Sequence, residues 1–249
     1  MTSLRTKLTS GQSCTGIFSK ALDSAIVEAA GLAGLDFIIL DTEHGPVSLE
    51  KLHDHVRAAR LTPMASVIRV KGVDAHAIGS ALDTGADGVQ IPNVSTARQA
   101  EEAVQAARFH PFGRRGVCRF VRAASFGAQE KVSYFSDANE KVVILQVEGV
   151  EGVKNLPEIL AVQGFDVLFI GPYDLSQSIG LPGEVDSPQV RALINEISSA
   201  AKAANKTLGI FCDTPDALRN YRRNEIPYIA YSVDMSIFRD AVSKLIASE

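Results

Sequence analysis

The sequence of 249 residues lacks several features that would each indicate a particular class of protein. Its formal net charge is −4, so it has no basic field that would favour binding to nucleic acid. Its apolar runs are far shorter than the roughly 20 residues that a membrane-spanning helix needs. Residues 1–13 contain no apolar stretch typical of a secretory signal. We therefore expect neither a nucleic-acid partner nor a membrane partner.

Cysteine is also scarce. Cys14, Cys118 and Cys212 are odd in number and lie far apart, so they form neither a disulfide framework nor a cluster with the spacing of metal ligands. We expect them to be small, mostly buried side chains in a protein of the reducing cytoplasm.

What the chain does contain is an alternation of short apolar runs with segments of helical spacing. Short apolar runs bounded by polar residues are typical of strands buried on both faces of a parallel sheet. We expect strands at 15–18, 37–40, 63–70, 87–92, 142–148, 165–170, 207–211 and 228–232. We expect helices at 23–33, 48–60, 74–84, 96–108, 128–139, 153–162, 188–205, 215–223 and 235–247. This order predicts one domain over residues 1–249, an α/β fold of the (β/α)₈ TIM-barrel type.

An open, doubly wound sheet is the structural alternative. That fold usually carries a glycine-rich phosphate loop after its first strand, with the pattern G-x-G-x-x-G. The sequence has no such pattern there, which favours the barrel.

Two acidic residues lie at or just beyond the ends of neighbouring strands of the predicted barrel. Glu148 ends the run VVILQVE, and Asp174 follows the next run in FDVLFIGPYD. Carboxylates at the carboxyl ends of barrel strands lie where such folds keep their chemistry, and they suit a hard divalent cation. Without a metal, Glu148 would be an ion-pair partner in the core and Asp174 a turn residue.

Other polar residues follow the strands at the same expected edge, namely Asp41, Glu43, His44, Arg69, Gln90 and Gln146. A 2-oxo acid chelates a divalent ion through its carboxylate and ketone oxygens, and the ion then stabilises an enolate. Arg69 could add hydrogen bonds to the enolate oxygen, or it could form a structural ion pair with Asp41 or Glu43. His44 could be a general base that Asp41 orients. Gly171 would let backbone amides approach a carboxylate closely.

Four segments carry a resemblance to a known family: DTEHGP (41–46), VIRV (67–70), LQVEGVEGVKNL (145–156) and FIGPYDLSQSIGLPG (169–183). In this order they resemble the metal-dependent, class II pyruvate aldolases that act on 4-hydroxy-2-oxoheptanedioate and 2-keto-3-deoxy sugar acids. The resemblance covers nearly the whole chain. It implies reversible cleavage of a 4-hydroxy-2-oxo acid to pyruvate and an aldehyde, with Mg²⁺, Mn²⁺ or Co²⁺ as cofactor. It also implies a swapped C-terminal helix and a homohexamer built as a trimer of dimers.

The same resemblance assigns roles to individual residues. It implies metal ligands at Glu148 and Asp174, and a His44–Asp41 pair. The residues that it implies as contacts of the substrate are Gln146, Arg69 and the backbone near Tyr173 and Asp174. Arg122 matches a later arginine of the family, and we expect it, with the loop 113–116, to influence the choice of aldehyde.

The chain departs from the family at Thr42, at Arg119 and Phe120, and at Tyr231 and Ser232, so the aldehyde stays open. Related barrels decarboxylate oxaloacetate or cleave acyl-CoA esters. A Schiff-base aldolase would need a desolvated lysine at the rim, for which Lys71 is the plausible candidate. A barrel that binds a 2-oxo acid without turnover would need fewer polar groups than this chain carries.

Overall fold

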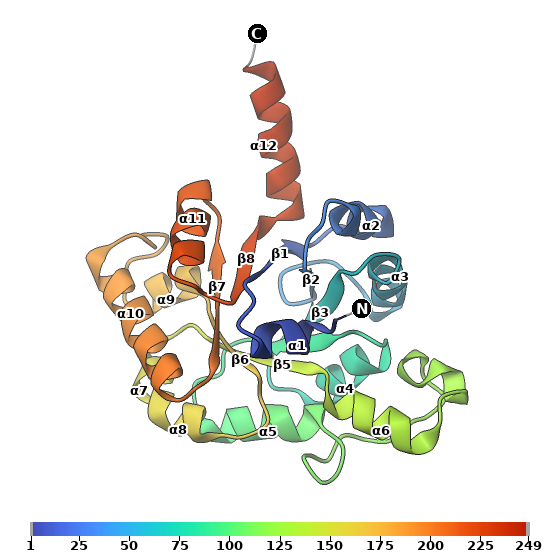
Figure 1. The fold of residues 1–249 in the computed structure, drawn as a ribbon. Coiled ribbons are helices and arrows are strands. Elements are labelled where there is room, and N and C mark those ends of the chain that lie inside the picture. Colours follow the sequence, from blue (N-terminus) through green and yellow to red (C-terminus); the bar gives the residue numbers. More distant parts are fainter. Residues whose placement is uncertain (1, 248–249) are drawn as a thin grey trace.

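The computed structural model describes residues 2–247, and its centre is a closed barrel of eight parallel strands (Figure 1). The strands are β1 (Cys14–Ser19), β2 (Phe37–Asp41), β3 (Ala65–Arg69), β4 (Gly88–Ile91), β5 (Val142–Val147), β6 (Val167–Ile170), β7 (Thr207–Cys212) and β8 (Tyr228–Val233). Each strand pairs with its neighbour in the sequence, and β8 closes the ring on β1. The predicted (β/α)₈ barrel is therefore confirmed, and the open sheet is excluded.

Helices surround this barrel (Figure 1). They are α1 (Leu4–Thr9), α2 (Ser24–Leu32), α3 (Leu49–Ala59), α4 (Ala75–Asp83), α5 (Ala97–Ala107), the 3₁₀ segment η1 (Arg122–Gly127), α6 (Lys131–Asn139), α7 (Val150–Lys154), α8 (Leu156–Ala161), α9 (Pro172–Ser178), α10 (Pro188–Ala203), α11 (Pro215–Arg223) and α12 (Asp234–Ile246). The side chain of Ser48 caps the start of α3 by accepting a hydrogen bond from the amide of Lys51. The segment 171–187 was expected to be a loop, and that was wrong, because Pro172 occupies the first turn of α9.

The barrel interior is filled by side chains. Phe18, Phe37, Phe169 and Tyr228 belong to an inner apolar cluster, and the rings of Phe37 and Tyr228 stack 3.9 Å apart. Helix α1 was not predicted from the sequence, and its Leu4 and Leu8 join this cluster at the amino-terminal end of the strands. A second and larger apolar layer lies between the strands and the outer helices. Buried polar side chains such as Asp41, Arg69 and Gln146 lie toward the carboxyl ends of the strands, at the mouth of the barrel.

The last helix, α12, projects away from the barrel instead of packing along it (Figure 1). It exposes Met235, Phe238, Leu245 and Ile246. Its first residue, Asp234, is buried at the mouth and accepts hydrogen bonds from Ser19 Oγ at 2.7 Å and from the backbone amides of Lys20 and Ala21 at 3.0 Å. The base of α12 is thereby fixed to the segment that follows β1.

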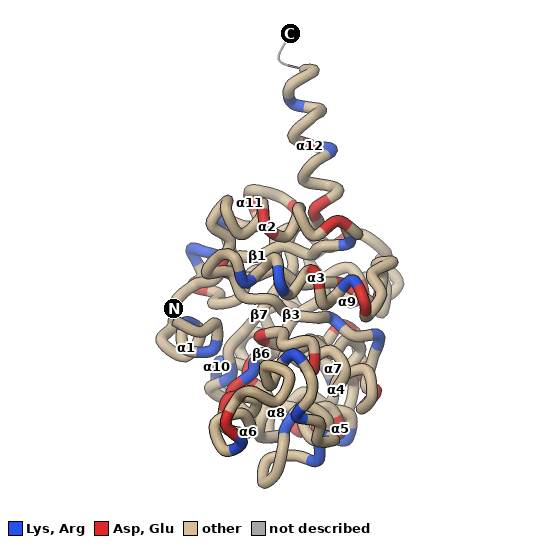
Figure 2. The backbone as a smooth tube through the Cα atoms, turned by 90° about the vertical axis from the view of Figure 1, so that its right-hand side faces the viewer, with Lys and Arg blue, Asp and Glu red and all other residues tan. Residues whose placement is uncertain are grey.

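Acidic and basic residues are both scattered over the molecule (Figure 2). Over residues 2–247, no helix combines the length and the apolar character that crossing a membrane requires.

Candidate active site

Five buried polar side chains from four adjacent strands line one side of the mouth. Asp41 ends β2, Arg69 ends β3, Gln90 lies in β4, and Gln146 and Glu148 lie in and directly after β5. Neighbouring parallel strands bring their carboxyl ends together, and in the register Asp41 lies beside Arg69, which lies beside Gln90. These predicted residues therefore form one cluster.

A bidentate ion pair is the centre of this cluster. Arg69 Nε and Nη2 donate to the two carboxylate oxygens of Asp41 at 2.9 and 2.8 Å, and Nη1 lies 3.1 Å from Glu43 Oε2. The guanidinium also lies over the ring of Phe18, 4.6 Å from its centroid. Burial alone would raise the pKa of Asp41, but the hydrogen bonds and charge of Arg69 outweigh it, so the pKa is lowered. Asp41 is therefore an ionised anchor for Arg69.

The structure does not form the side-chain pair predicted between His44 and Asp41. The arginine fork occupies both oxygens of Asp41, and His44 contributes only its backbone amide, at 3.4 Å. The imidazole is 59% exposed, and its Nε2 lies 3.8 Å from Glu43 Oε2. Burial raises the pKa of Glu43, as do the charges of Asp41 and Asp174, against the opposing effect of Arg69 and His44. Glu43 is therefore the acid nearest to the His44 ring.

A chain of hydrogen bonds leads from Gln90 to Glu148. Gln90 Nε2 donates to Gln146 Oε1 at 2.5 Å, and Gln146 Nε2 donates to Glu148 Oε2. Gln90 Oε1 is buried and has no hydrogen-bond partner among the described residues. A buried acceptor without a partner is costly, so this atom indicates room for a donor from a bound molecule or from water.

Asn93 is a site residue that the sequence analysis missed. It follows β4 with a φ of +58°, a conformation that asparagine tolerates better than most residues. Its backbone amide donates to Glu148 Oε1 at 2.8 Å, and its Nδ2 donates to Glu43 Oε1 at 3.2 Å. Asn93 thus links the two carboxylates. Its place directly beyond a strand was the available signal.

Glu148 and Asp174 form the candidate metal site. Burial raises the pKa of Glu148 to about 7, and the charges of Asp174 and Glu43 act in the same direction. Asp174 lies in the first turn of α9 and is exposed. A Cβ on Gly171 would lie 2.5 Å from Glu148 Oε2, so only glycine lets α9 begin this close to the carboxylate.

The donor set fits a hard cation that is held by few protein ligands. In the described part of the chain, no three His, Cys, Asp or Glu residues converge as a full ligand set. Two carboxylates beside an open mouth suit an ion of the Mg²⁺ type, which keeps several positions for water and substrate. A cation there would also relieve the repulsion that raises the pKa of Glu148.

The side chains of two other predicted residues bond to groups outside this cluster. The Tyr173 hydroxyl donates to Asp213 Oδ2 at 2.5 Å, and this bond raises the pKa of the phenol to about 12. Arg122 Nη1 donates to the carbonyl of Thr84 at 3.0 Å, and Thr84 lies between the end of α4 and the start of β4. Arg122 therefore lies at the amino-terminal end of the barrel and does not join the mouth of its own chain.

Lys20 is a further mouth residue that the sequence analysis did not name. It directly follows β1, and its Nζ lies 3.6 Å from Asp41 Oδ2. The lysine considered at the sequence level, Lys71, is exposed. Lys20 could have been found by the rule that located the other site residues, since it follows the expected strand 15–18.

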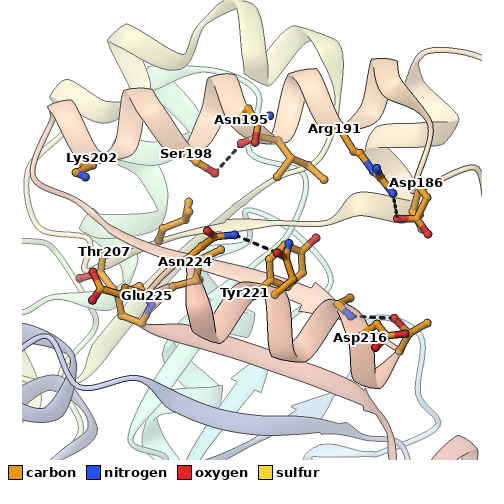
Figure 3. A pocket seen from close by; sticks show the side chains of 18 of the residues that line it. Asp186, Arg191, Asn195, Ser198, Lys202, Thr207, Asp216, Tyr221, Asn224 and Glu225 are labelled. Carbon is orange, nitrogen blue, oxygen red and sulfur yellow. Dashed lines mark hydrogen bonds and ion pairs between the residues drawn. The ribbon is translucent and has the colours of Figure 1, made fainter.

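A large groove that the described residues form lies elsewhere. It is a groove of about 1110 Å³ between α10 and α11, with side chains such as Arg191, Ser198, Tyr221 and Asn224 along it (Figure 3). None of the predicted site residues lines this groove. Its rim is occupied by local pairs such as Arg191 with Asp186 (Figure 3). The polar cluster at the mouth is therefore the better candidate for chemistry.

The chain as a whole is similar to known proteins. The sequence profile of the HpcH/HpaI aldolase/citrate lyase family matches residues 14–241. The chain is 34% identical to a 2-keto-3-deoxy-L-rhamnonate aldolase of Escherichia coli O17:K52:H18 (strain UMN026 / ExPEC), over 97% of this chain and 90% of that protein. It is 32% identical to a 2-dehydro-3,6-dideoxy-6-sulfogluconate aldolase of Pseudomonas putida, over 94% and 91%. A crystal structure of a family protein from Burkholderia cenocepacia J2315 matches with a TM-score of 0.95 and 31% identity, over 100% and 99%.

Proposed function

Because the chain belongs to the HpcH/HpaI aldolase/citrate lyase family, we propose that it cleaves a 4-hydroxy-2-oxo acid reversibly to pyruvate and an aldehyde, with a divalent metal ion. The two curated relatives described above are aldolases, that is carbon–carbon lyases, and their names specify a keto or dehydro sugar acid as substrate. The observation that carries the proposal is that buried Glu148 accepts a hydrogen bond from Gln146 and lies close enough to Asp174 for that charge to raise its pKa further, with Arg69 in the same buried cluster.

In this proposal Glu148 and Asp174 hold Mg²⁺, Mn²⁺ or Co²⁺. When bound, such an ion is a Lewis acid for the ketone and carboxylate oxygens of a 2-oxo acid. Gln146 supports this arrangement, because its amide donates to Glu148 and is itself positioned by Gln90. Gly171 and the backbone near Tyr173 and Asp174 contact the substrate carboxylate.

Arg69 stabilises the negative charge that develops on the C2 oxygen as the C3–C4 bond breaks. Its guanidinium is already oriented by Asp41 and Glu43, so little reorganisation is needed when the charge appears. His44 is exposed at the mouth and takes the proton of the C4 hydroxyl, with Glu43 as its acidic neighbour. The C3–C4 electron pair then forms the pyruvate enolate, the C4 carbon leaves as the aldehyde, and a proton added at C3 gives pyruvate.

We further propose that the chain acts as a homohexamer with exchanged C-terminal helices, in the cytoplasm. The exposed apolar residues of α12 support an assembly, because a single projecting helix gains little stability without tertiary packing. Arg122 supports it too, since from the amino-terminal end of its barrel it could reach a mouth only in another copy. The three cysteines, all free, support a reducing compartment.

The test is pyruvate C3 hydrogen exchange in deuterated water, measured together with aldehyde release from a panel of 4-hydroxy-2-oxo acids. A chelator should abolish both activities, and Mg²⁺, Mn²⁺ or Co²⁺ should restore them. Borohydride with pyruvate should leave the protein active. A borohydride-trapped lysine adduct would instead establish a Schiff-base aldolase and refute the proposal.

A further inference from the structure

Lys20 is a cation at the mouth whose bonding capacity is largely unused. An ammonium group has three donors, yet within residues 2–247 the Nζ of Lys20 makes no hydrogen bond and has one ionic contact, 3.6 Å from Asp41 Oδ2. The side chain is 32% exposed, so Nζ can be reached from the solvent side of the mouth.

The neighbouring cation, Arg69, differs in this respect. All three of its guanidinium nitrogens already contact Asp41 or Glu43. Asp41 in turn has each oxygen paired with a nitrogen of that fork, so it does not need Lys20 as a hydrogen-bond donor. Lys20 is therefore the cation of this cluster with the fewer contacts to protein groups, and it is a second cation available to a ligand besides Arg69.

The backbone of Lys20 is held in place although its head group is free. Its amide donates to both oxygens of buried Asp234, at 3.2 and 3.0 Å, and the next amide donates to the same carboxylate. A Cβ placed on Gly45 would lie 3.4 Å from Lys20 Cγ, which puts the aliphatic stem against the backbone after β2. The backbone and the aliphatic stem that carry the ammonium group are thus held in position.

The ring order places the strand that Lys20 follows opposite the strand that Glu148 follows. In a closed barrel of eight strands, β1 lies across from β5, so Lys20 faces the side of the mouth that carries Glu148. A substrate bound there by its carboxylate and ketone extends its distal carbons toward the other side. The free cation on that side is Lys20.

We infer that Lys20 determines specificity by binding an oxyanion at the far end of the aldehyde half of the substrate. The inference rests on the proposed aldolase function and names its substrate class, 4-hydroxy-2-oxo acids with a terminal carboxylate or sulfonate. Lys20 has no Schiff-base role in this scheme, because its side chain is 32% exposed and its Nζ lies beside the Asp41 carboxylate, which is not the desolvated pocket that such chemistry needs.

The experiment measures kcat/KM for aldol addition of pyruvate to three aldehydes of similar length: succinic semialdehyde, its neutral amide, and a sulfonate analogue. Lys20→Met should lower the preference for the carboxylate over the amide by about 10–100-fold, the usual effect of losing a hydrogen bond to a charged group. Lys20→Arg should retain most of the preference, and Lys20→Glu should invert it. Lys71→Met, a lysine that follows β3, is the matched control and should leave the ratio unchanged.

Pyruvate C3 exchange in the same variants separates the outcomes. If wild-type protein neither exchanges pyruvate nor forms aldol product, the proposed function fails, and this inference fails with it. If wild-type protein is active but Lys20→Met slows exchange and both additions equally, Lys20 supports the Asp41–Arg69 pair, and the inference alone is overturned. Loss confined to the sulfonate or to the carboxylate identifies which oxyanion the site takes.

Discussion

Replacing Arg69 with lysine separates what its positive charge does from what its planar fork does. The structure gives the guanidinium two bonds to Asp41 and one contact with Glu43. A lysine ammonium keeps the charge but cannot make the parallel pair of bonds. Asp41, which is fully buried, would keep at most one of its two bonds.

Two effects of the Arg69→Lys change can be estimated. Loss of one hydrogen bond to a buried charged group costs about 1.5–3 kcal/mol, which should appear as a lower free energy of unfolding. Removal of a positioned donor to a developing oxyanion costs about 10²–10³-fold in rate. Since enolate formation is common to pyruvate exchange and aldol cleavage, both should fall by that factor.

The matched control is Arg108→Lys. Arg108 is also a buried arginine paired with an aspartate, at 2.8 Å from Asp166, but it lies at the amino-terminal end of the barrel, where it also binds the carbonyls of Asn139 and Lys141. This variant should lose stability similarly while keeping its exchange rate per folded molecule. Stability is measured by denaturant unfolding, and exchange by NMR in deuterated water. If Arg69→Lys exchanges pyruvate at the wild-type rate, or if both variants lose exchange equally, the role assigned to Arg69 is refuted.

Three further predictions concern the rest of the cluster and its assembly. His44→Ala should lower cleavage by about 10²–10⁴-fold while a titration still shows pyruvate binding; wild-type cleavage would mean that the base is elsewhere, with Glu43→Gln the next variant to assay. Arg122→Ala should change the ranking of acidic against neutral aldehydes in the assembled protein, and an unchanged ranking would contradict any contact with the substrate. Because the pKa of Asp41 is lowered in the folded protein, its carboxylate stabilises the fold above its unfolded pKa of about 3.9, and this contribution is lost as the pH falls through the lower folded value. Asp41→Asn should therefore be less stable than wild type at pH 7, by about 3–5 kcal/mol in denaturant unfolding. If the difference in free energy of unfolding between the two proteins did not become smaller below about pH 4, this account would be contradicted.

The sequence predicted the barrel because each buried strand is a short apolar run with polar residues beyond it. The same pattern predicted most of the site, since Asp41, Arg69 and Glu148 lie at or directly beyond the ends of strands. Lys20 and Asn93 also lie directly beyond strands, so the rule that found the others would have included them. The pattern failed at α9, where a glycine and a proline mark the start of a helix and were read as a loop.

Pairings within the cluster could not be read from spacing. His44 is three residues from Asp41, but Arg69, from the next strand, takes both oxygens of Asp41. Which of the two side chains pairs with Asp41 depends on their positions in the folded protein, and residue spacing does not give those positions. The location of Arg122 could, in contrast, have been predicted from the sequence. Any segment between the end of a barrel helix and the start of the next strand lies at the amino-terminal end, and Arg122 lies between α5 and β5.

Asp234 couples the position of the projecting helix α12 to that of the segment at the mouth. The carboxylate that begins α12 is also the acceptor for Ser19 and for the amides of Lys20 and Ala21, so the helix cannot pivot at its base without moving the segment that carries Lys20. By thermodynamic reciprocity, whatever docks on α12 and shifts that base must change affinity at the mouth, and a ligand held at the mouth must change the docking by the same factor. Catalytic efficiency in this protein would then depend on its own concentration, even at saturating metal.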